Sequence, residues 1–145
     1  MILISPTLLK LITDAAESAY PAECCGLLAG RDTNGEVVVT RVAPSRNLSE
    51  TDVCDSFEVD PEVRFRLMRE LGTFDGHTAE RIVGHYHSHP DHPGKPSERD
   101  IAMAYEPDLV WLITTVGANR ATATAAFLIA RESGHLQQIK LRISK

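Results

Sequence analysis

Three histidines alternate along one short segment of the chain, where they could bind a metal ion. They are His85, His87 and His89, and they follow an apolar lead-in. Because side chains alternate between the two faces of a strand, a strand over 81–89 would project all three from one face. Side chains two positions apart start about 6 to 7 Å from each other, so two imidazoles can lean together and bind one ion through nitrogen.

A carboxylate downstream of the histidines could complete the metal site. Three prolines and one glycine mark a loop over 90–96, and a helical run begins at Ser97. Asp100 would therefore lie in the first turn of a helix. Since a catalytic zinc site has three protein ligands and a fourth position for water, the set His87, His89 and Asp100 meets the requirement.

Each of these residues also has an ordinary structural explanation. Ser97 and Asp100 are spaced as in a capping box, in which a serine oxygen accepts an N–H of the first helical turn and the acidic residue bonds back. For this pair taken alone the cap is the favoured explanation, and a single strand histidine is more often a packed group than a ligand. The combined spacing of the two histidines, the serine and the aspartate favours a metal site.

Two segments of the chain resemble the JAMM (MPN+) metalloprotease family. The run His87-Ser88-His89-Pro90 is followed, after the loop, by Ser97-x-x-Asp100, which is similar to the family's signature. An upstream segment over 21–30 contains Glu23 and resembles the other characteristic segment of the family. Two separated matches are more specific than one short motif.

The resemblance implies a role for each residue. One zinc ion would be held by His87, His89 and Asp100 and would activate a water molecule. Glu23 would be the general base that takes a proton from this water and returns it to the departing amine, although its sequence position alone favours a solvated residue at the start of a strand. The hydroxyl of Ser97 would stabilise negative charge on the former carbonyl oxygen.

The resemblance also implies a class of substrate. Members of the family act on ubiquitin-like proteins, and small forms process the C-terminal tails of ubiquitin-like sulfur carriers. We therefore expect a zinc metallopeptidase or isopeptidase of JAMM type. Its partner would be a ubiquitin-like or sulfur-carrier protein with an extended C-terminal tail, because such a tail can pair with an exposed strand edge and present its last peptide bond to the metal.

Five further residues near these motifs could take part in chemistry. We expect His85 to lie behind the ligands or in the core. His92, in the loop over the site, and Asn47 could contact substrate, but an exposed loop histidine and a turn-forming asparagine are the favoured explanations. Cys24 and Cys25 suggest a cysteine hydrolase, but their strand context predicts small buried residues.

The elements that would position these residues alternate between helices and strands. Apolar residues recur at helical spacing in some segments and at strand spacing in others. We expect a mixed, curved β-sheet flanked by helices, and the resemblance implies the cytidine-deaminase-like architecture of JAMM/MPN domains. The predicted elements are helices over 5–20, 61–71 and 98–105, strands over 24–29, 37–40, 56–59, 81–89, 109–116, 122–130 and 135–143, a long loop over 43–55, and a polar connection over 72–80 that carries an exposed His77.

Length and composition narrow the function classes. A chain of 145 residues predicts one domain, over 1–145. Its formal net charge of −5 argues against a partner that is bound through nucleic-acid phosphates. There is no basic leader and no run of 18 apolar residues, and the three cysteines form no even framework, so we expect a cytoplasmic protein without a membrane partner. The oligomeric state is not predicted.

Three alternative functions stay open. A non-catalytic MPN-type scaffold would bind metal without turnover, but every ligand and the base are present. A cytidine-deaminase-like zinc enzyme would need cysteine ligands in a P-C-x-x-C segment, which the sequence lacks. A cell-wall or phage-type peptidase would use the same site, although a missing signal peptide disfavours export.

Overall fold

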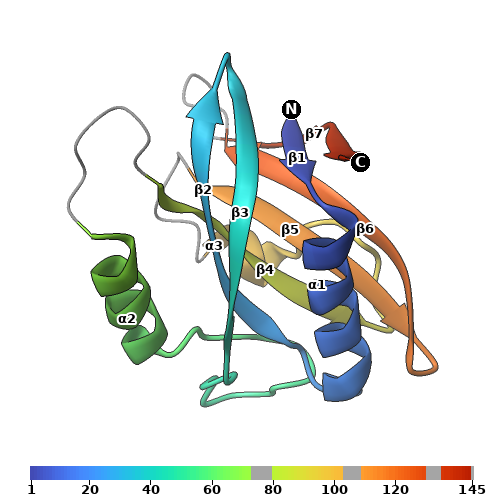
Figure 1. Ribbon diagram of the computed structural model, residues 1–145. Helices are drawn as coiled ribbons and strands as arrows, with labels where there is room; N and C mark the ends of the chain where they lie inside the picture. Colours follow the sequence, from blue (N-terminus) through green and yellow to red (C-terminus); the bar gives the residue numbers. More distant parts are fainter. Residues whose placement is uncertain (73–79, 103–108, 130–134, 145) are drawn as a thin grey trace.

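One mixed sheet of eight strands organises the part of the chain that this computed structural model describes, namely residues 1–72, 80–102, 109–129 and 135–144. The strands lie in the order β7-β6-β5-β4-β2-β3-β1-β8 (Figure 1). In chain order the elements are β1 (Ile2–Ile4), α1 (Pro6–Ala19), β2 (Cys25–Thr33), β3 (Glu36–Ser45), α2 (Pro61–Leu71), β4 (Arg81–Pro90), α3 (Glu98–Ala102), β5 (Val110–Gly117), β6 (Arg120–Ile129), β7 (Leu136–Ile139) and β8 (Leu141–Ile143).

The sheet curves until its two edges almost meet. β7 and β8 form the opposite ends of the strand order, yet only Lys140 separates them in the chain. Because one residue spans roughly 3.3 to 3.6 Å at most, the edges formed by β7 and β8 must lie close together. Parallel and antiparallel pairs are mixed: β4 runs antiparallel to β2 and parallel to β5, whereas β1 runs parallel to both β3 and β8.

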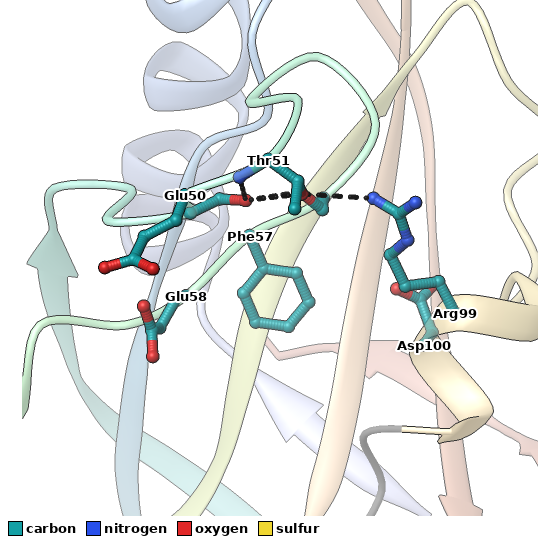
Figure 2. A pocket seen from close by; sticks show the side chains of 8 residues that line it. Glu50, Thr51, Phe57, Glu58, Arg99 and Asp100 are labelled. Carbon is teal, nitrogen blue, oxygen red and sulfur yellow. Dashed lines mark hydrogen bonds between the residues drawn. The ribbon is translucent and has the colours of Figure 1, made fainter.

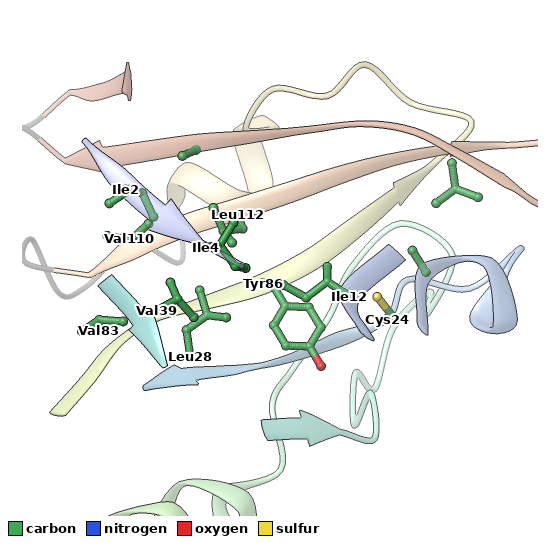
Figure 3. Packing of buried hydrophobic residues seen from close by; sticks show 13 residues of the cluster. Ile2, Ile4, Ile12, Cys24, Leu28, Val39, Val83, Tyr86, Val110 and Leu112 are labelled. Carbon is green, nitrogen blue, oxygen red and sulfur yellow. The ribbon is translucent and has the colours of Figure 1, made fainter. Parts of the chain in front are cut away.

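Helix α1 covers one face of the sheet. The hydroxyl of Ser5 accepts the N–H of Leu8 at 3.2 Å, and Pro6 occupies the first helical turn, so the helix begins with a complete cap. Its buried residues Ile12 and Ala16 belong to the main core, into which β2, β4 and β5 also project (Figure 3). The side chains from these strands include Leu28, Tyr86 and Leu112.

Helix α2 covers the other face. Val63 and Leu67 of this helix pack against Leu27 and Ala29 of β2, which alternate along the strand with Leu28 on the α1 face. The same alternation in β4 points Tyr86 toward α1 and its neighbouring histidines to the opposite side of the sheet. None of the helices within the described residues is long and apolar enough to cross a membrane.

The predicted architecture is confirmed, with corrections at four elements. The predicted strand over 56–59 is wrong, because only Val59 pairs, in an isolated bridge to Asn47. β3 runs through to Ser45, since β2 pairs with it as far as Cys25, so the long loop starts later than predicted. β1 was not predicted, and the strand over 135–143 is in fact two strands that pair at opposite edges. The predicted end of the third helix at 105 and His77 lie outside the described residues.

Candidate metal centre

Strand β4 and helix α3 bring the three predicted metal ligands together. The Nε2 atoms of His87 and His89 lie 3.2 Å apart. The Oδ2 atom of Asp100 lies 3.3 Å from the first nitrogen and 2.9 Å from the second. All three side chains are buried. Because two donor atoms bound to one tetrahedral ion at 2.0–2.1 Å stand about 3.3 Å apart, the three separations suit a zinc ion between them.

The hydrogen bonding of His89 supports the same interpretation. Its Nδ1 atom lies 2.8 Å from the carbonyl oxygen of Pro93. A carbonyl oxygen can only accept, so Nδ1 carries the hydrogen and Nε2 of the neutral ring directs a lone pair at Asp100. Two lone pairs facing each other at 2.9 Å require a positive charge, either a proton or a cation. Burial lowers the pKa of His89, but the Asp100 and Pro93 hydrogen bonds raise it more.

Ser97 and Asp100 form the capping box, and the box also aims the carboxylate. The Asp100 N–H donates to Ser97 Oγ at 3.0 Å, and the Ser97 N–H donates to Asp100 Oδ2 at 2.9 Å. The oxygen that closes the box is the one that faces both histidines. Burial opposes ionisation of Asp100, but hydrogen bonds with His87 and His89 hold its pKa below the ordinary value, so the carboxylate is anionic, as a metal ligand must be.

The carboxylate of Glu23 lies beside the two histidines. One of its carboxylate oxygens and one ring nitrogen of each of His87 and His89 all lie within 4.8 Å of one another. The residue is 3% exposed, and its Oε1 atom has no hydrogen-bond partner among the residues that the structure describes. Burial raises the pKa of Glu23 to about 8. A carboxyl group in this state can exchange a proton near neutral pH.

The backbone of Glu23 is fixed from two sides. Its N–H donates to the carbonyl of Val53 at 2.7 Å, and its own carbonyl accepts the side-chain amide of Asn47 at 3.2 Å. On the sheet side, the N–H of the next residue, Cys24, donates to the hydroxyl of Ser88 at 2.8 Å. Ser88 lies between His87 and His89 in strand β4. Strand β4 therefore positions the ligands and the carboxylate together.

Asn47 organises the loop that covers Glu23. Its amide nitrogen also donates to the carbonyl of Ser56 at 2.8 Å, and its Oδ1 atom accepts the N–H groups of Ser49 and Glu58 at 3.0 and 3.1 Å. The predicted turn-forming asparagine is thus part of the structure, but it holds a whole loop rather than one turn. Sequence analysis missed this role because its partners are spread over the chain.

His85 packs against His87, and no hydrogen bond joins it to the proposed ligand atoms. Its ring lies 5.4 Å from that of Phe57, 4.9 Å from that of Trp111 and 5.7 Å from that of His87, between centroids. Within the described residues its Nδ1 atom has no hydrogen-bond partner. Burial lowers the pKa of His85 to about 3, so the ring is neutral.

Two cavities flank the site. One of about 160 Å³ is lined by residues that include Glu23, Ser97 and His92. His92 is half-buried and lies 3.3 Å from the carbonyl of Cys54, in the loop across the cavity, which agrees with its predicted place over the site. The other cavity, of about 410 Å³, is lined by Asp100 and the loop over 49–58 (Figure 2). Substrate can therefore approach the cluster from two sides.

The adjacent cysteines are buried thiols. Burial raises the pKa of Cys25 to about 12 and also raises that of Cys24. The Sγ atom of Cys25 donates to the carbonyl of Arg46 at 3.6 Å. Since the thiolate is the nucleophilic form, this geometry supports the predicted packing role and disfavours a cysteine hydrolase.

Comparison with known proteins identifies the family. Residues 5–129 match the family described as prokaryotic homologs of the JAB domain. The chain belongs to the prokaryotic JAB family. The resemblance to JAMM/MPN proteases is therefore confirmed. A protein of Desulfitobacterium hafniense with a solved structure and 28% sequence identity superimposes on the JAB chain with a TM-score of 0.81, covering 100% of this chain and 94% of that one.

Two named proteins are similar in sequence to this chain. The JAB chain is 33% identical over 107 residues to the desampylase of Haloferax volcanii, and the match covers 72% of each protein. It is 34% identical over 100 residues to tail tip assembly protein K of Escherichia phage N15, which covers 69% of this chain but 35% of the phage protein. JAB membership and a desampylase relative support a hydrolase role.

Proposed function

We propose that the chain is a zinc metallopeptidase that hydrolyses a peptide or isopeptide bond at the C-terminal tail of a ubiquitin-like protein of the sulfur-carrier type. The observation that carries this proposal is the buried convergence of His87, His89 and Asp100, with the carboxylate of Glu23 beside them. The Oε1 atom of Glu23 has no hydrogen-bond partner in the described part of the chain. The relative named desampylase supports a ubiquitin-like substrate.

The three ligands would present two nitrogen atoms and one oxygen to the ion. Zinc bound there would supply Lewis acidity, which lowers the pKa of a water molecule toward about 7 and polarises a carbonyl group. The Pro93 carbonyl fixes His89 in the tautomer that can act as a ligand, and the capping box fixes Asp100. These contacts pre-organise the ligand atoms.

Glu23 would move the proton. Its pKa is raised to about 8 by burial, and this pKa would fall when positive charge is bound beside it. A carboxylate near its pKa at neutral pH can accept a proton from the attacking water and return it to the departing amine. The cavity of about 160 Å³ that Glu23 lines would hold the groups that exchange this proton.

Ser97 would bind the developing oxyanion. Its oxygen accepts the N–H of Asp100, which leaves the hydroxyl hydrogen free to donate to the former carbonyl oxygen. The side chain is half-buried and lines the smaller cavity, so substrate can reach it. One such donor contributes about 3 to 4 kcal/mol to the transition state in another hydrolase.

The proposal is tested with ubiquitin-like carriers that bear C-terminal extensions. We expect the zinc-loaded protein to cleave one of them at the tail, as read by mass spectrometry, and a chelator to abolish cleavage until zinc is restored. A thiol alkylator should leave the activity of a Cys54→Ser variant unchanged, because Cys24 and Cys25 are buried thiols and Cys54 is the partly exposed one. Activity that resists chelation, or that only the alkylator removes, would refute the proposal.

The phage relative supplies a second candidate function. The similarity to a phage tail tip assembly protein favours the phage-type peptidase as this second candidate. Such a peptidase would use the same metal ligands and the same base on a cell-wall peptide. Cell-wall peptides therefore form a second substrate arm of the experiment. Cleavage of these peptides together with inert carriers would favour the phage-type function.

A further inference from the structure

We propose that the larger cavity beside Asp100 binds a basic side chain of the substrate tail, close to the scissile bond. This inference rests on the proposed function and adds a recognition element to it. The cavity measures about 410 Å³ and is lined by Phe57, Glu50, Glu58 and Arg99 in addition to Asp100 (Figure 2). That volume can enclose one long side chain with part of its backbone.

Two carboxylates on one side of the cavity are free to bind a cation. Figure 2 shows the carboxylates of Glu50 and Glu58 on the same side of the Phe57 ring. Both side chains are exposed, and neither carboxylate has a hydrogen bond or ion pair within the described part of the chain. The position of Glu58 is fixed, because its N–H donates to Asn47.

An aromatic ring lies between the carboxylates and the metal ligands. Phe57 stacks on His87 with centroids 4.2 Å apart and an interplanar angle of 17°, which holds the ring in place. Phe57 is half-buried and also lines the cavity. The aliphatic stem of a lysine or arginine can pack on such a ring while its charged end reaches a carboxylate.

Arg99 sets the direction in which the basic side chain must point. Its guanidinium group donates to Thr51 Oγ1 at 3.4 Å, on the side of Phe57 away from the two glutamates (Figure 2). A ligand cation would be repelled from Arg99 and attracted to Glu50 and Glu58. The cavity therefore discriminates between a basic and an acidic side chain.

The same cavity reaches the proposed catalytic centre. Asp100 lines it and also contacts both ligand histidines. A tail that places its scissile bond at the metal would therefore place a neighbouring residue in this cavity. We infer that the substrate is an extended tail with an arginine or lysine within a few residues of the cleaved bond.

Peptides of eight residues that carry Arg, Ala or Glu at one of four positions test this inference. For the wild-type enzyme we expect kcat/KM to favour Arg over Glu by about 5- to 30-fold at one of these positions. The double variant Glu50→Gln/Glu58→Gln should reduce this ratio to about 2 or less, and high salt should reduce it in the wild type. The matched control Glu36→Gln, at the far end of the β2–β3 hairpin, should keep the ratio.

Binding to the Glu23→Gln variant separates this inference from the proposed function. If no peptide is cleaved, the proposed function fails, and calorimetry with the same peptides still tests the cavity. Tighter binding of the Arg peptide, lost when the two glutamates are also replaced, supports the cavity. Equal binding of the Arg and Glu peptides, or an unchanged preference in the double variant, overturns it. Thermal unfolding checks that the double variant is folded.

Discussion

At the scale of single residues, the site combines groups whose charge states depend on burial. Glu23 is shielded from water, and this burial raises its pKa. Asp100 is also buried, but its hydrogen bonds keep it anionic. Two carboxylates in one site can therefore have different functions, one as a ligand and one as a proton carrier.

Glu23→Gln should abolish turnover and keep zinc. The amide has nearly the same shape but cannot accept a proton from water, so we expect kcat to fall by about 10²- to 10⁴-fold. The ligand atoms of His87, His89 and Asp100 are unchanged, so the zinc content should stay near one ion per chain. The measurements are steady-state kinetics and metal analysis, with Glu36→Gln as the control. A normal cleavage rate in Glu23→Gln would show that another group is the base.

His87→Ala should lose zinc and activity together. Its Nε2 atom is 3.2 Å from that of His89 and 3.3 Å from Asp100 Oδ2, so its removal leaves two donor atoms. His85→Phe is the matched control, because that ring packs among aromatic residues and bonds to none of the ligand atoms in the described chain. We expect the control to retain zinc. Metal retention in His87→Ala would place the ion elsewhere.

The residue types and spacing of the ligands could be predicted because they are local. His87 and His89 share one strand face, and Ser97 and Asp100 share one helical turn. Glu23 could be singled out only through the family resemblance, since an acidic residue before a strand is usually solvated. Its burial comes from contacts with Val53 and Asn47, which no local pattern encodes.

At the scale of elements, the loop after β3 is as important to the site as the strands. Residues 47–58 have little regular structure. The side chain of Asn47 forms hydrogen bonds with backbone groups along this loop, which in a strand would bond to a neighbouring strand. Phe57 belongs to this loop and packs on His87. The loop therefore connects Glu23, His87 and the larger cavity.

Asn47→Ala should weaken both folding and turnover while zinc is retained. It would leave the carbonyls of Glu23 and Ser56 and the N–H groups of Ser49 and Glu58 without their partner. We expect a loss of about 2 to 4 kcal/mol in the free energy of unfolding, measured in urea. Asn47→Asp is the comparison variant, because it keeps the acceptor and loses the donor. An unchanged kcat in Asn47→Ala would argue against a role in positioning Glu23.

The predicted boundaries of the elements were wrong where contacts between segments far apart in the sequence determine them. The alternating residues over 56–59 predict a strand, but the bonds of Asn47 hold Ser56 in a loop. The alternation over 135–143 is real, yet the chain passes from one edge of the sheet to the other at Lys140. Hydrophobic periodicity predicts the type of an element and not which edge it joins.

At the scale of the whole molecule, an ion pair joins the far end of β2 to the start of β4. Arg81 donates to Asp32 at 2.8 and 3.0 Å. The hydrogen bond from Arg81 holds the pKa of Asp32 below its ordinary value. A carboxylate whose pKa is lower in the folded state stabilises the fold above the unfolded pKa of about 4 and loses this effect as the pH falls below it.

Asp32→Asn should therefore lower the free energy of unfolding at neutral pH, and this effect should be smaller in acid. Both groups are partly exposed, so we expect about 0.2 to 1 kcal/mol of destabilisation at pH 7, within the range of surface pairs. The difference between wild type and variant should shrink between pH 7 and pH 3, because the unfolded carboxyl takes up its proton near pH 4 and the folded one only at a lower pH. Urea unfolding at the two pH values measures it. A difference that grows in acid would contradict the assignment.

The shared use of Asp100 Oδ2 has a thermodynamic consequence. The oxygen that faces the histidines also closes the capping box of α3, a helix of five residues. Ligand occupancy and the fraying of this short helix are therefore linked equilibria. Hydrogen–deuterium exchange at the amides of Asp100 and Ile101 should slow when zinc is added to the wild type and stay unchanged in His87→Ala. The exchange rates of these two backbone amides would thus report whether the ion is bound.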